Sequence, residues 1–328
     1  MVIKERNTTF DMMKGIGILL VIIGHFIFES KHFIYTFHMP LFFILAGIFF
    51  TPKEPMKLLR KDFKRLLIPA LITATILFIA GIAYDFYTHK NYRDVFNQNI
   101  LRVLYPTSLV KLNLGGWVIW FLFSLFWCKT IYNVVCQKIN GHVVLLVSLI
   151  LSLFAIFIDT QITNLPLGVL PGIGAIFFFA AGAWFSKYKI KYGRLIEIFL
   201  IGCLIIWALY LICGNHKVVN IDLIVNRYSY YPFDILIGIG GTFAIWLLCE
   251  YIIKKISTAT KFLAFCGMNS LLILCIHAID YKLIRSNNRD EIFVLTLTIL
   301  TYIGVVILIS KSTKLRRVFG VELWKEMK

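Results

Sequence analysis

Residues 11–50 read DMMKGIGILLVIIGHFIFESKHFIYTFHMPLFFILAGIFF, a run that is almost wholly apolar apart from a few ionisable side chains. Lys14 and His25 are eleven residues apart, close to three turns of an α-helix, so they share one face. Asp11 precedes Lys14 by three residues and Glu29 follows His25 by four, which places both near the same stripe. Ionisable groups are costly in hydrocarbon and are usually functional there. The pattern therefore predicts a first membrane helix with one polar wall that faces protein or water.

The rest of the chain is also strongly apolar. Hydrophobic residues make up 59% of its 328 residues, and the mean hydropathy is +0.81, whereas a soluble domain is about half apolar. Windows of about 20 apolar residues are long enough to cross a bilayer. We therefore expect an all-α, polytopic membrane helix bundle that forms a single domain over residues 1–328. Ten spans are predicted, near 11–29, 33–50, 66–84, 116–136, 142–159, 167–186, 194–213, 233–252, 262–281 and 292–311.

The basic residues are unevenly distributed between the predicted loops. The net charge is +17, but if the N-terminus is cytoplasmic, 24 of the 34 Lys and Arg residues fall on the cytoplasmic side and 10 on the other. This asymmetry is the signature of the positive-inside rule. The excess therefore indicates topology and contact with membrane lipids, and not nucleic-acid binding. An even number of spans would place both termini in the cytoplasm, in a multi-pass protein of the inner (cytoplasmic) cell membrane.

A basic segment joins the second and third predicted spans. Residues 51–65 carry six Lys and Arg residues, and those at 57, 60, 61, 64 and 65 repeat with helical spacing before Pro69. Long basic side chains at such a joint commonly reach toward lipid phosphates and serve as topology anchors. Arg65 lies inside the apolar run that follows, so we expect its side chain to enter the protein at membrane depth.

Polar or aromatic side chains also mark three later stretches. Trp120 lies deeper in the fourth span than an interfacial tryptophan needs to. Asn226 and Tyr228 lie in an outer joint that reads NRYSYYPFD, which is either an aromatic belt or a platform for a sugar ring. The ninth span contains a further polar set, Asn269, Ser270 and His277.

The intramembrane histidines allow three kinds of chemistry. A zinc site of His25, His38 and His277 lacks any supporting ligand spacing, and we expect no metal. A proton-coupled transporter would also use intramembrane histidine and acidic residues, although no broken helix pair recurs in two matching halves. A general base is the third option, because imidazole titrates near physiological pH.

Three motifs carry a resemblance to a known family. The stretches DMMKGIGILLVIIGH (11–25), FHMPLFFILAG (37–47) and KRLLIP (64–69), in this order, resemble the opening of the integral-membrane acyltransferase family 3, closest to its fucose 4-O-acetylase-like branch. The stretches 120–122, 226–231 and 269–277 are also similar. The chain departs from some branches by having Lys64 before a single arginine, where those branches carry two arginines.

The resemblance implies acyl transfer, usually of an acetyl group, from cytoplasmic acetyl-coenzyme A or another acyl-coenzyme A. The implied acceptor is a hydroxyl of an envelope carbohydrate or a lipid-linked glycan. His25 matches the family's histidine and is our candidate general base, with Lys14 as a second catalytic residue. Lys14, Lys64 and Arg65 are the predicted donor-binding residues. The remaining candidates would bind the acceptor or support the site: Asp11, Glu29, His38, Trp120, Asn226, Tyr228, Asn269, Ser270 and His277. Direct transfer and an acyl-histidine intermediate are both compatible with this set.

Overall fold

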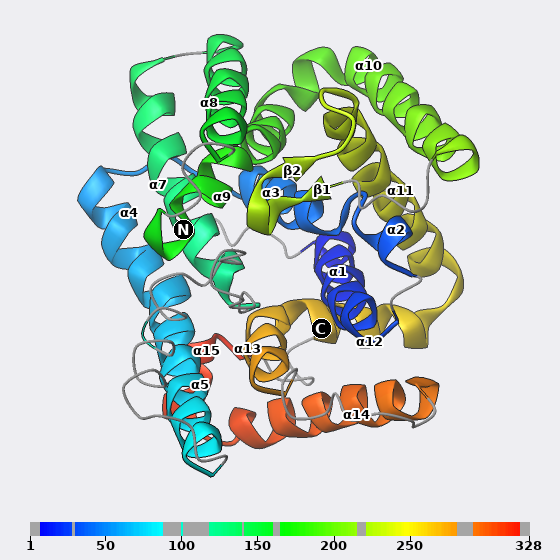
Figure 1. The fold of residues 1–328 in the computed structure, drawn as a ribbon. Helices are drawn as coiled ribbons and strands as arrows, with labels where there is room; N and C mark the ends of the chain where they lie inside the picture. The colour runs from blue at the N-terminus through cyan, green and yellow to red at the C-terminus, as the bar shows by residue number, and fades with distance from the viewer. Residues whose placement is uncertain are drawn as a thin grey trace.

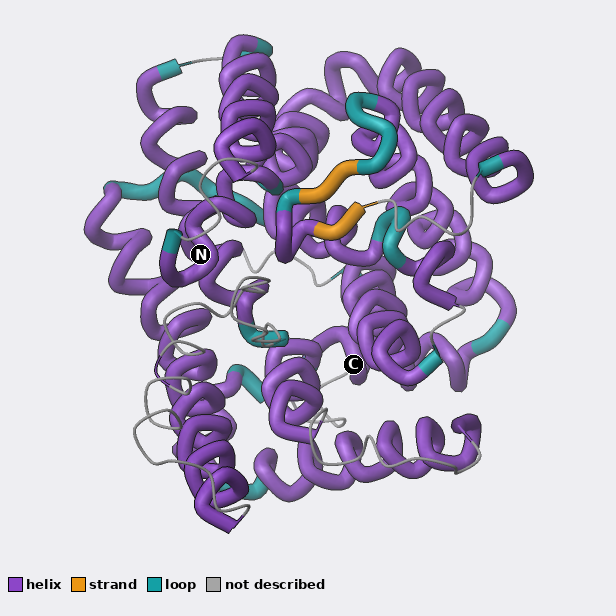
Figure 2. Tube along the Cα trace, viewed as in Figure 1, coloured by secondary structure: helices purple, strands orange, loops and turns teal. Residues whose placement is uncertain are grey.

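The computed structural model describes residues 7–27, 30–87, 100, 118–139, 141–159, 165–214, 221–280 and 291–321. Helices make up nearly all of these residues (Figures 1 and 2). The elements, in chain order, are α1 (Thr8–Phe26), α2 (Lys31–Ile34), α3 (His38–Ile48), α4 (Pro55–Asp62), the π-turn η2 (Phe63–Leu67), α5 (Ile68–Tyr87), α7 (Trp120–Lys138), α8 (Val143–Asp159), the 3₁₀ turn η4 (Pro166–Gly168), α9 (Val169–Gly174), α10 (Ile176–Cys213), β1 (Ile221–Asp222), the 3₁₀ turn η5 (Leu223–Val225), β2 (Arg227–Tyr228), α11 (Phe233–Lys255), α12 (Ser257–Met268), α13 (Ser270–Asp280), α14 (Glu291–Ser310) and α15 (Thr313–Phe319).

The predicted all-α membrane bundle is confirmed in its class. Within the described residues, six helices are long and apolar enough to cross a membrane, or seven if α12 and α13, which are bent by 69° at their junction, form one span. The count of ten and the cytoplasmic position of both termini stay predictions. The expected joint at 187–194 is not a loop, because α10 runs through it with one non-helical residue, Tyr192.

Glycines set the distance between the helices that carry the polar wall. The helix α1 packs most extensively against α12, and the two cross at Gly15 and Gly267. A Cβ atom added to Gly267 would lie 1.7 Å from the carbonyl oxygen of Asp11, and one added to Gly15 would lie 2.0 Å from that of Leu263. Without a strong hydrophobic force between helices in lipid, small residues allow the close packing that holds them together. The backbone of α1 is thus fixed against α12 over its first turns.

Two side chains of α7 hold the basic segment in place. Asn133 accepts a hydrogen bond from the Lys53 backbone N–H (3.0 Å) and donates one to the Lys53 carbonyl oxygen (2.8 Å). Lys129 forms a 2.7 Å ion pair with Asp62, which is 1% exposed. A buried charge without a partner would be strongly destabilising, so this pair fixes the end of α4 against α7.

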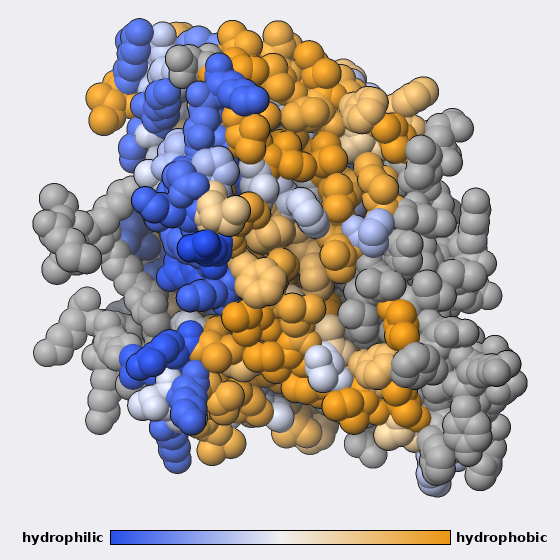
Figure 3. All heavy atoms as spheres, turned by 90° about the vertical axis from the view of Figure 1, so that its left-hand side faces the viewer, coloured by the Kyte–Doolittle hydropathy of each residue, from blue (hydrophilic) through white to orange (hydrophobic). Residues whose placement is uncertain are grey.

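The segment that α7 holds presents its basic side chains to the exterior. All five Lys and Arg residues of α4 and η2 are exposed: Lys57, Arg60, Lys61, Lys64 and Arg65. In Figure 3, which views the side of the molecule where α4, α5 and α7 lie, hydrophilic residues gather along one edge of a broad hydrophobic band. This arrangement is the one expected for a bundle with a polar edge at one membrane surface and a lipid-facing belt.

A two-stranded hairpin lies between α10 and α11. Strands β1 and β2 pair antiparallel, with Ile221 opposite Tyr228 and Asp222 opposite Arg227. The Ile221 N–H donates a hydrogen bond to the Tyr35 carbonyl oxygen at 3.2 Å. This bond joins the hairpin to the turn between α2 and α3, next to the start of α3.

Candidate active site

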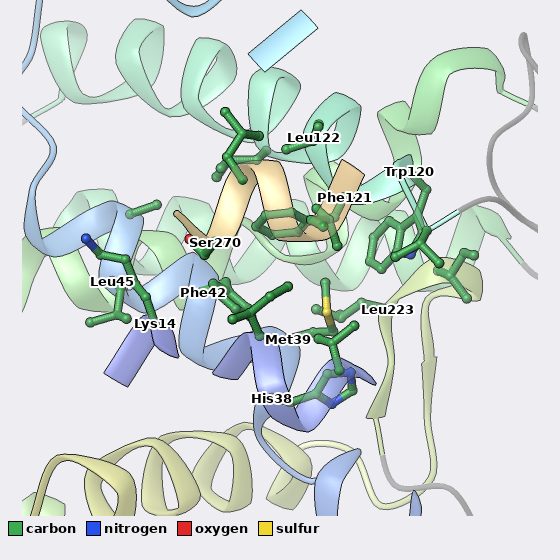
Figure 4. A pocket seen from close by; sticks show the side chains of 18 of the residues that line it. Lys14, His38, Met39, Phe42, Leu45, Trp120, Phe121, Leu122, Leu223 and Ser270 are labelled. Carbon is green, nitrogen blue, oxygen red and sulfur yellow. The ribbon is translucent and has the colours of Figure 1, made fainter. Parts of the chain in front are cut away.

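A partly open cavity of about 300 Å³ lies between α1, α3, α7, α13 and the hairpin. Figure 4 places Lys14 at one end of it and His38, Trp120 and Leu223 toward the other end. Most of its wall is apolar. Its polar and amphipathic lining residues in the described part of the chain are Lys14, His25, Tyr35, His38, Trp120, Asp222 and Ser270.

Lys14 is oriented by two neighbours. Its Nζ atom forms a 2.8 Å ion pair with the carboxylate of Asp11, one turn earlier on α1, and it lies 5.6 Å from the centre of the Phe49 ring. The Asp11 side chain is 8% exposed and that of Lys14 30% exposed. The ammonium group is thus held at the cavity rather than free to extend into solvent, and Asp11 has the orienting position expected from its spacing.

His25 lies in the cavity wall with a second histidine beside it. The rings of His25 and His277 are 5.1 Å apart, centre to centre. His277 is fully buried, and its Nδ1 lies 3.0 Å from the hydroxyl oxygen of Tyr302. Tyr302 belongs to α14 and is 2% exposed. The structure therefore brings together a row of three side chains from α1, α13 and α14.

Sequence reasoning missed Tyr302. A lone tyrosine in the last apolar span was the available signal, because a buried tyrosine hydroxyl usually has a hydrogen-bond partner. Nothing in its spacing indicated that the partner would be His277, since the pairing depends on how α13 and α14 pack.

His38 has a defined tautomer. Its Nδ1 lies 2.8 Å from the Ile34 carbonyl oxygen, which can only accept a hydrogen bond, so Nδ1 carries the proton and Nε2 is left as an acceptor. The ring of Tyr35 lies 4.7 Å away. His38 therefore offers the cavity a hydrogen-bond acceptor at the end opposite Lys14.

Of the other site residues predicted in the apolar spans, some line the cavity and some have a structural role. Trp120 and Ser270 line the cavity. Asn269 is buried and does not line it; its Nδ2 donates to the Phe265 carbonyl oxygen at 3.0 Å. It lies at the bend between α12 and α13. Glu29 lies outside the described residues.

Asn226 and Tyr228, expected to bind the acceptor, do not line the cavity. Asn226 has a left-handed backbone conformation (φ 45°), is 3% exposed and packs against Gly174. The Tyr228 hydroxyl donates to the Gly174 carbonyl oxygen at 3.1 Å. Both residues hold the hairpin against α9, and the hairpin residues that do line the cavity are Ile221 to Ile224. Spacing alone could not show which side of the hairpin faces inward.

The expectation that Arg65 enters the protein is wrong. Arg65 and Lys64 are exposed on the π-turn, whereas the next residue, Leu66, lines the cavity. A π-turn contains more residues per turn than an α-helix. Counting back from Pro69 in α-helical steps therefore predicts that Arg65 faces the protein interior, whereas its side chain lies on the exterior. Their role in donor binding stays a prediction.

These features define a multi-pass membrane helix bundle with a lysine, histidines and a carboxylate around an internal cavity. A family model described as an acyltransferase domain matches residues 7–310. The chain therefore belongs to the acyltransferase family 3 and is a membrane acyltransferase. No curated protein and no solved structure matches it. The transporter alternative receives no support from this membership.

Proposed function

We propose that this acyltransferase moves an acetyl group from cytoplasmic acetyl-coenzyme A to a hydroxyl of an envelope carbohydrate, with His25 as the general base. The observation that carries the proposal is that Lys14 and His25, eleven residues apart on α1, both line one cavity. A hydroxyl is a weak nucleophile, so a base must take its proton as its oxygen attacks the thioester carbonyl. The thiolate of coenzyme A then leaves, and the proton on His25 is available to it.

The spacing on α1 separates the roles of Lys14 and His25. Eleven residues of α-helix correspond to roughly 16 Å along the axis at about 1.5 Å per residue. This gap is too large for the Lys14 ammonium group to stabilise the oxygen that becomes negative beside His25. Lys14 is therefore assigned to binding the donor, which is anionic, and His25 to the reacting hydroxyl.

His277 and Tyr302 are assigned to orienting His25. The adjacent imidazole of His277 is held through Nδ1 by the Tyr302 hydroxyl, and a base that is held in one orientation loses less entropy at the transition state. Both residues are positioning residues, because neither lines the cavity within the described part of the chain.

The charge distribution supports opposite entry routes for the two substrates. The basic edge formed by α4 and η2 suits the phosphates of coenzyme A, and the positive-inside rule assigns that edge to the cytoplasm. Lys14 lies at one end of the cavity and His38 and Trp120 at the other (Figure 4). The donor would enter at the Lys14 end and the acceptor at the His38 end.

The test is acetyl transfer by purified protein in detergent. Wild type should transfer label from radioactive acetyl-coenzyme A to de-O-acetylated envelope glycan, and His25→Ala should lose transfer while melting at the wild-type temperature. His142→Ala is the matched control, because His142 is an exposed histidine that bonds Trp184 and does not line the cavity. Normal transfer by His25→Ala would show that His25 is not the general base.

A further inference from the structure

The cavity has charges of opposite sign in its wall. Lys14 is its one ammonium group and Asp222 its one carboxylate, among the described residues that line it. Asp222 comes from β1, next to Leu223, which lies toward the end of the cavity away from Lys14 (Figure 4). No sequence motif marks Asp222, which lies in the joint between the spans predicted at 194–213 and 233–252.

The hairpin holds the Asp222 backbone in a fixed place. The backbone N–H of its neighbour Ile221 donates a hydrogen bond to the carbonyl oxygen of Tyr35, and Tyr35 also lines the cavity. Asp222 is paired with Arg227 across the two strands, and directly opposite residues of an antiparallel pair project to the same face. A carboxylate has about four lone-pair positions that can accept hydrogen bonds from a ligand.

The Asp222 carboxyl is partly buried, and this burial changes its pKa. Burial raises the pKa of the Asp222 carboxyl above its ordinary value, while Arg227, the Ile224 N–H and Lys31 each oppose that rise. A carboxylate that has lost water gains more from a hydrogen-bond donor than an exposed one does, because the local dielectric is lower.

We propose that Asp222 is a specificity-determining residue whose carboxylate accepts hydrogen bonds from hydroxyls of the carbohydrate acceptor. The proposal rests on the proposed function. Neighbouring hydroxyls on a sugar ring can donate to both oxygens of one carboxylate, as other paired donors do. The donor is excluded as the ligand of Asp222, because its phosphates are anionic and the cation that suits them, Lys14, lies toward the opposite end. Asp222 would thus distinguish carbohydrates by the positions of their hydroxyl groups. It lies at the end of the cavity where His38 offers a second hydrogen-bond acceptor.

Two variants separate this role from a structural one. Asp222→Asn keeps the size and shape of the side chain but removes its charge. Asp222→Glu keeps the charge and moves the carboxylate. The probe is de-O-acetylated envelope glycan titrated at saturating acetyl-coenzyme A, followed by a donor titration at saturating glycan, with the melting temperature of each variant measured in detergent.

The expected result is a change confined to the acceptor. Loss of a hydrogen bond to a charged group is worth about 1.5–3 kcal/mol, or roughly a 10- to 150-fold rise in the KM for glycan. The KM for acetyl-coenzyme A and the melting temperature of Asp222→Asn should stay at wild-type values. Asp222→Glu should also raise the KM for glycan, but less.

The outcomes distinguish this proposal from the function on which it rests. Wild-type protein that transfers no label would overturn both. Wild-type transfer together with an unchanged KM for glycan in Asp222→Asn would overturn the role of Asp222 alone. A rise in the KM for the donor, or a lower melting temperature with the KM for glycan unchanged, would identify Asp222 as a structural residue of the hairpin and would also overturn it.

Discussion

Replacing Gly267 by alanine should disable the enzyme without touching any polar residue of the cavity. The added Cβ would lie 1.7 Å from the Asp11 carbonyl oxygen, whereas real Cβ atoms essentially never approach closer than 3.0 Å. This oxygen belongs to the backbone of α1, so no flexible side chain can move aside. Helix α1 must shift from α12 by about 1 Å, and overpacking of this kind typically costs about 1–3 kcal/mol.

The same shift moves Lys14 and His25, because both belong to α1. A misplacement of about 1 Å in a reacting group can lower the rate roughly 100-fold. Gly267→Ala should therefore melt at a lower temperature in detergent and transfer acetyl groups about two orders of magnitude more slowly than wild type, measured with radioactive acetyl-coenzyme A and de-O-acetylated envelope glycan.

A matched control is available in the same bundle. Gly304 lies within α14, and a Cβ added there would meet nothing within 4 Å. Gly304→Ala should keep wild-type transfer and an equal or higher melting temperature, since alanine is the better helix former. If Gly267→Ala matches wild type in both melting and transfer, the close crossing of α1 and α12 does not control the site.

Three further outcomes are expected. Tyr302→Phe removes the hydroxyl beside His277 and should lower turnover roughly two- to thirteenfold, as for loss of a hydrogen bond worth about 0.5–1.5 kcal/mol net, with the KM for acetyl-coenzyme A unchanged; a normal turnover would show that Tyr302 does not position His25. Arg65→Ala should raise the Kd for coenzyme A by calorimetry at least about tenfold if one charged contact is lost, with Arg65→Lys intermediate because lysine lacks the bidentate fork; wild-type binding would make Arg65 a topology anchor. Lys57→Cys, in a background without the seven native cysteines, should react with an impermeant thiol reagent only after cells are permeabilised, and labelling of intact cells would reverse the proposed orientation.

The sequence predicted that Lys14 and His25 share one face of α1, and both line the same cavity, because helical periodicity is a local property. The spacing of Lys14 and His25 requires only that residues 11–25 form one helix, and Asp11 reaches Lys14 within one turn. Apolar windows likewise predicted the membrane bundle, since hydrophobicity is additive along a segment. The bend at Asn269 and the kink at Tyr192 were not predictable in this way, because each depends on packing between helices.

The rest of the site depends on non-local contacts. Arg65 was assigned to the wrong side because a π-turn interrupts the α-helical spacing before Pro69. Asp222 and Tyr302 reach the site through the docking of a hairpin and of the last long helix, and neither event leaves a periodic signal in the sequence. Asn226 and Tyr228 were predicted to bind the acceptor, but their side chains pack the hairpin against Gly174 of α9 and do not line the cavity.

The volume of the cavity bears on which part of the donor can lie beside His25. About 300 Å³ is at the small end of the range for ligand pockets, which is roughly 300–1,000 Å³. Space of that size accommodates a sugar ring together with a two-carbon unit, but not in addition the nucleotide of coenzyme A or a long hydrocarbon tail. On the proposed function, we expect the adenosine moiety to stay outside with only the thioester arm inside, so a short-chain acyl-coenzyme A should be a better donor than a long-chain one.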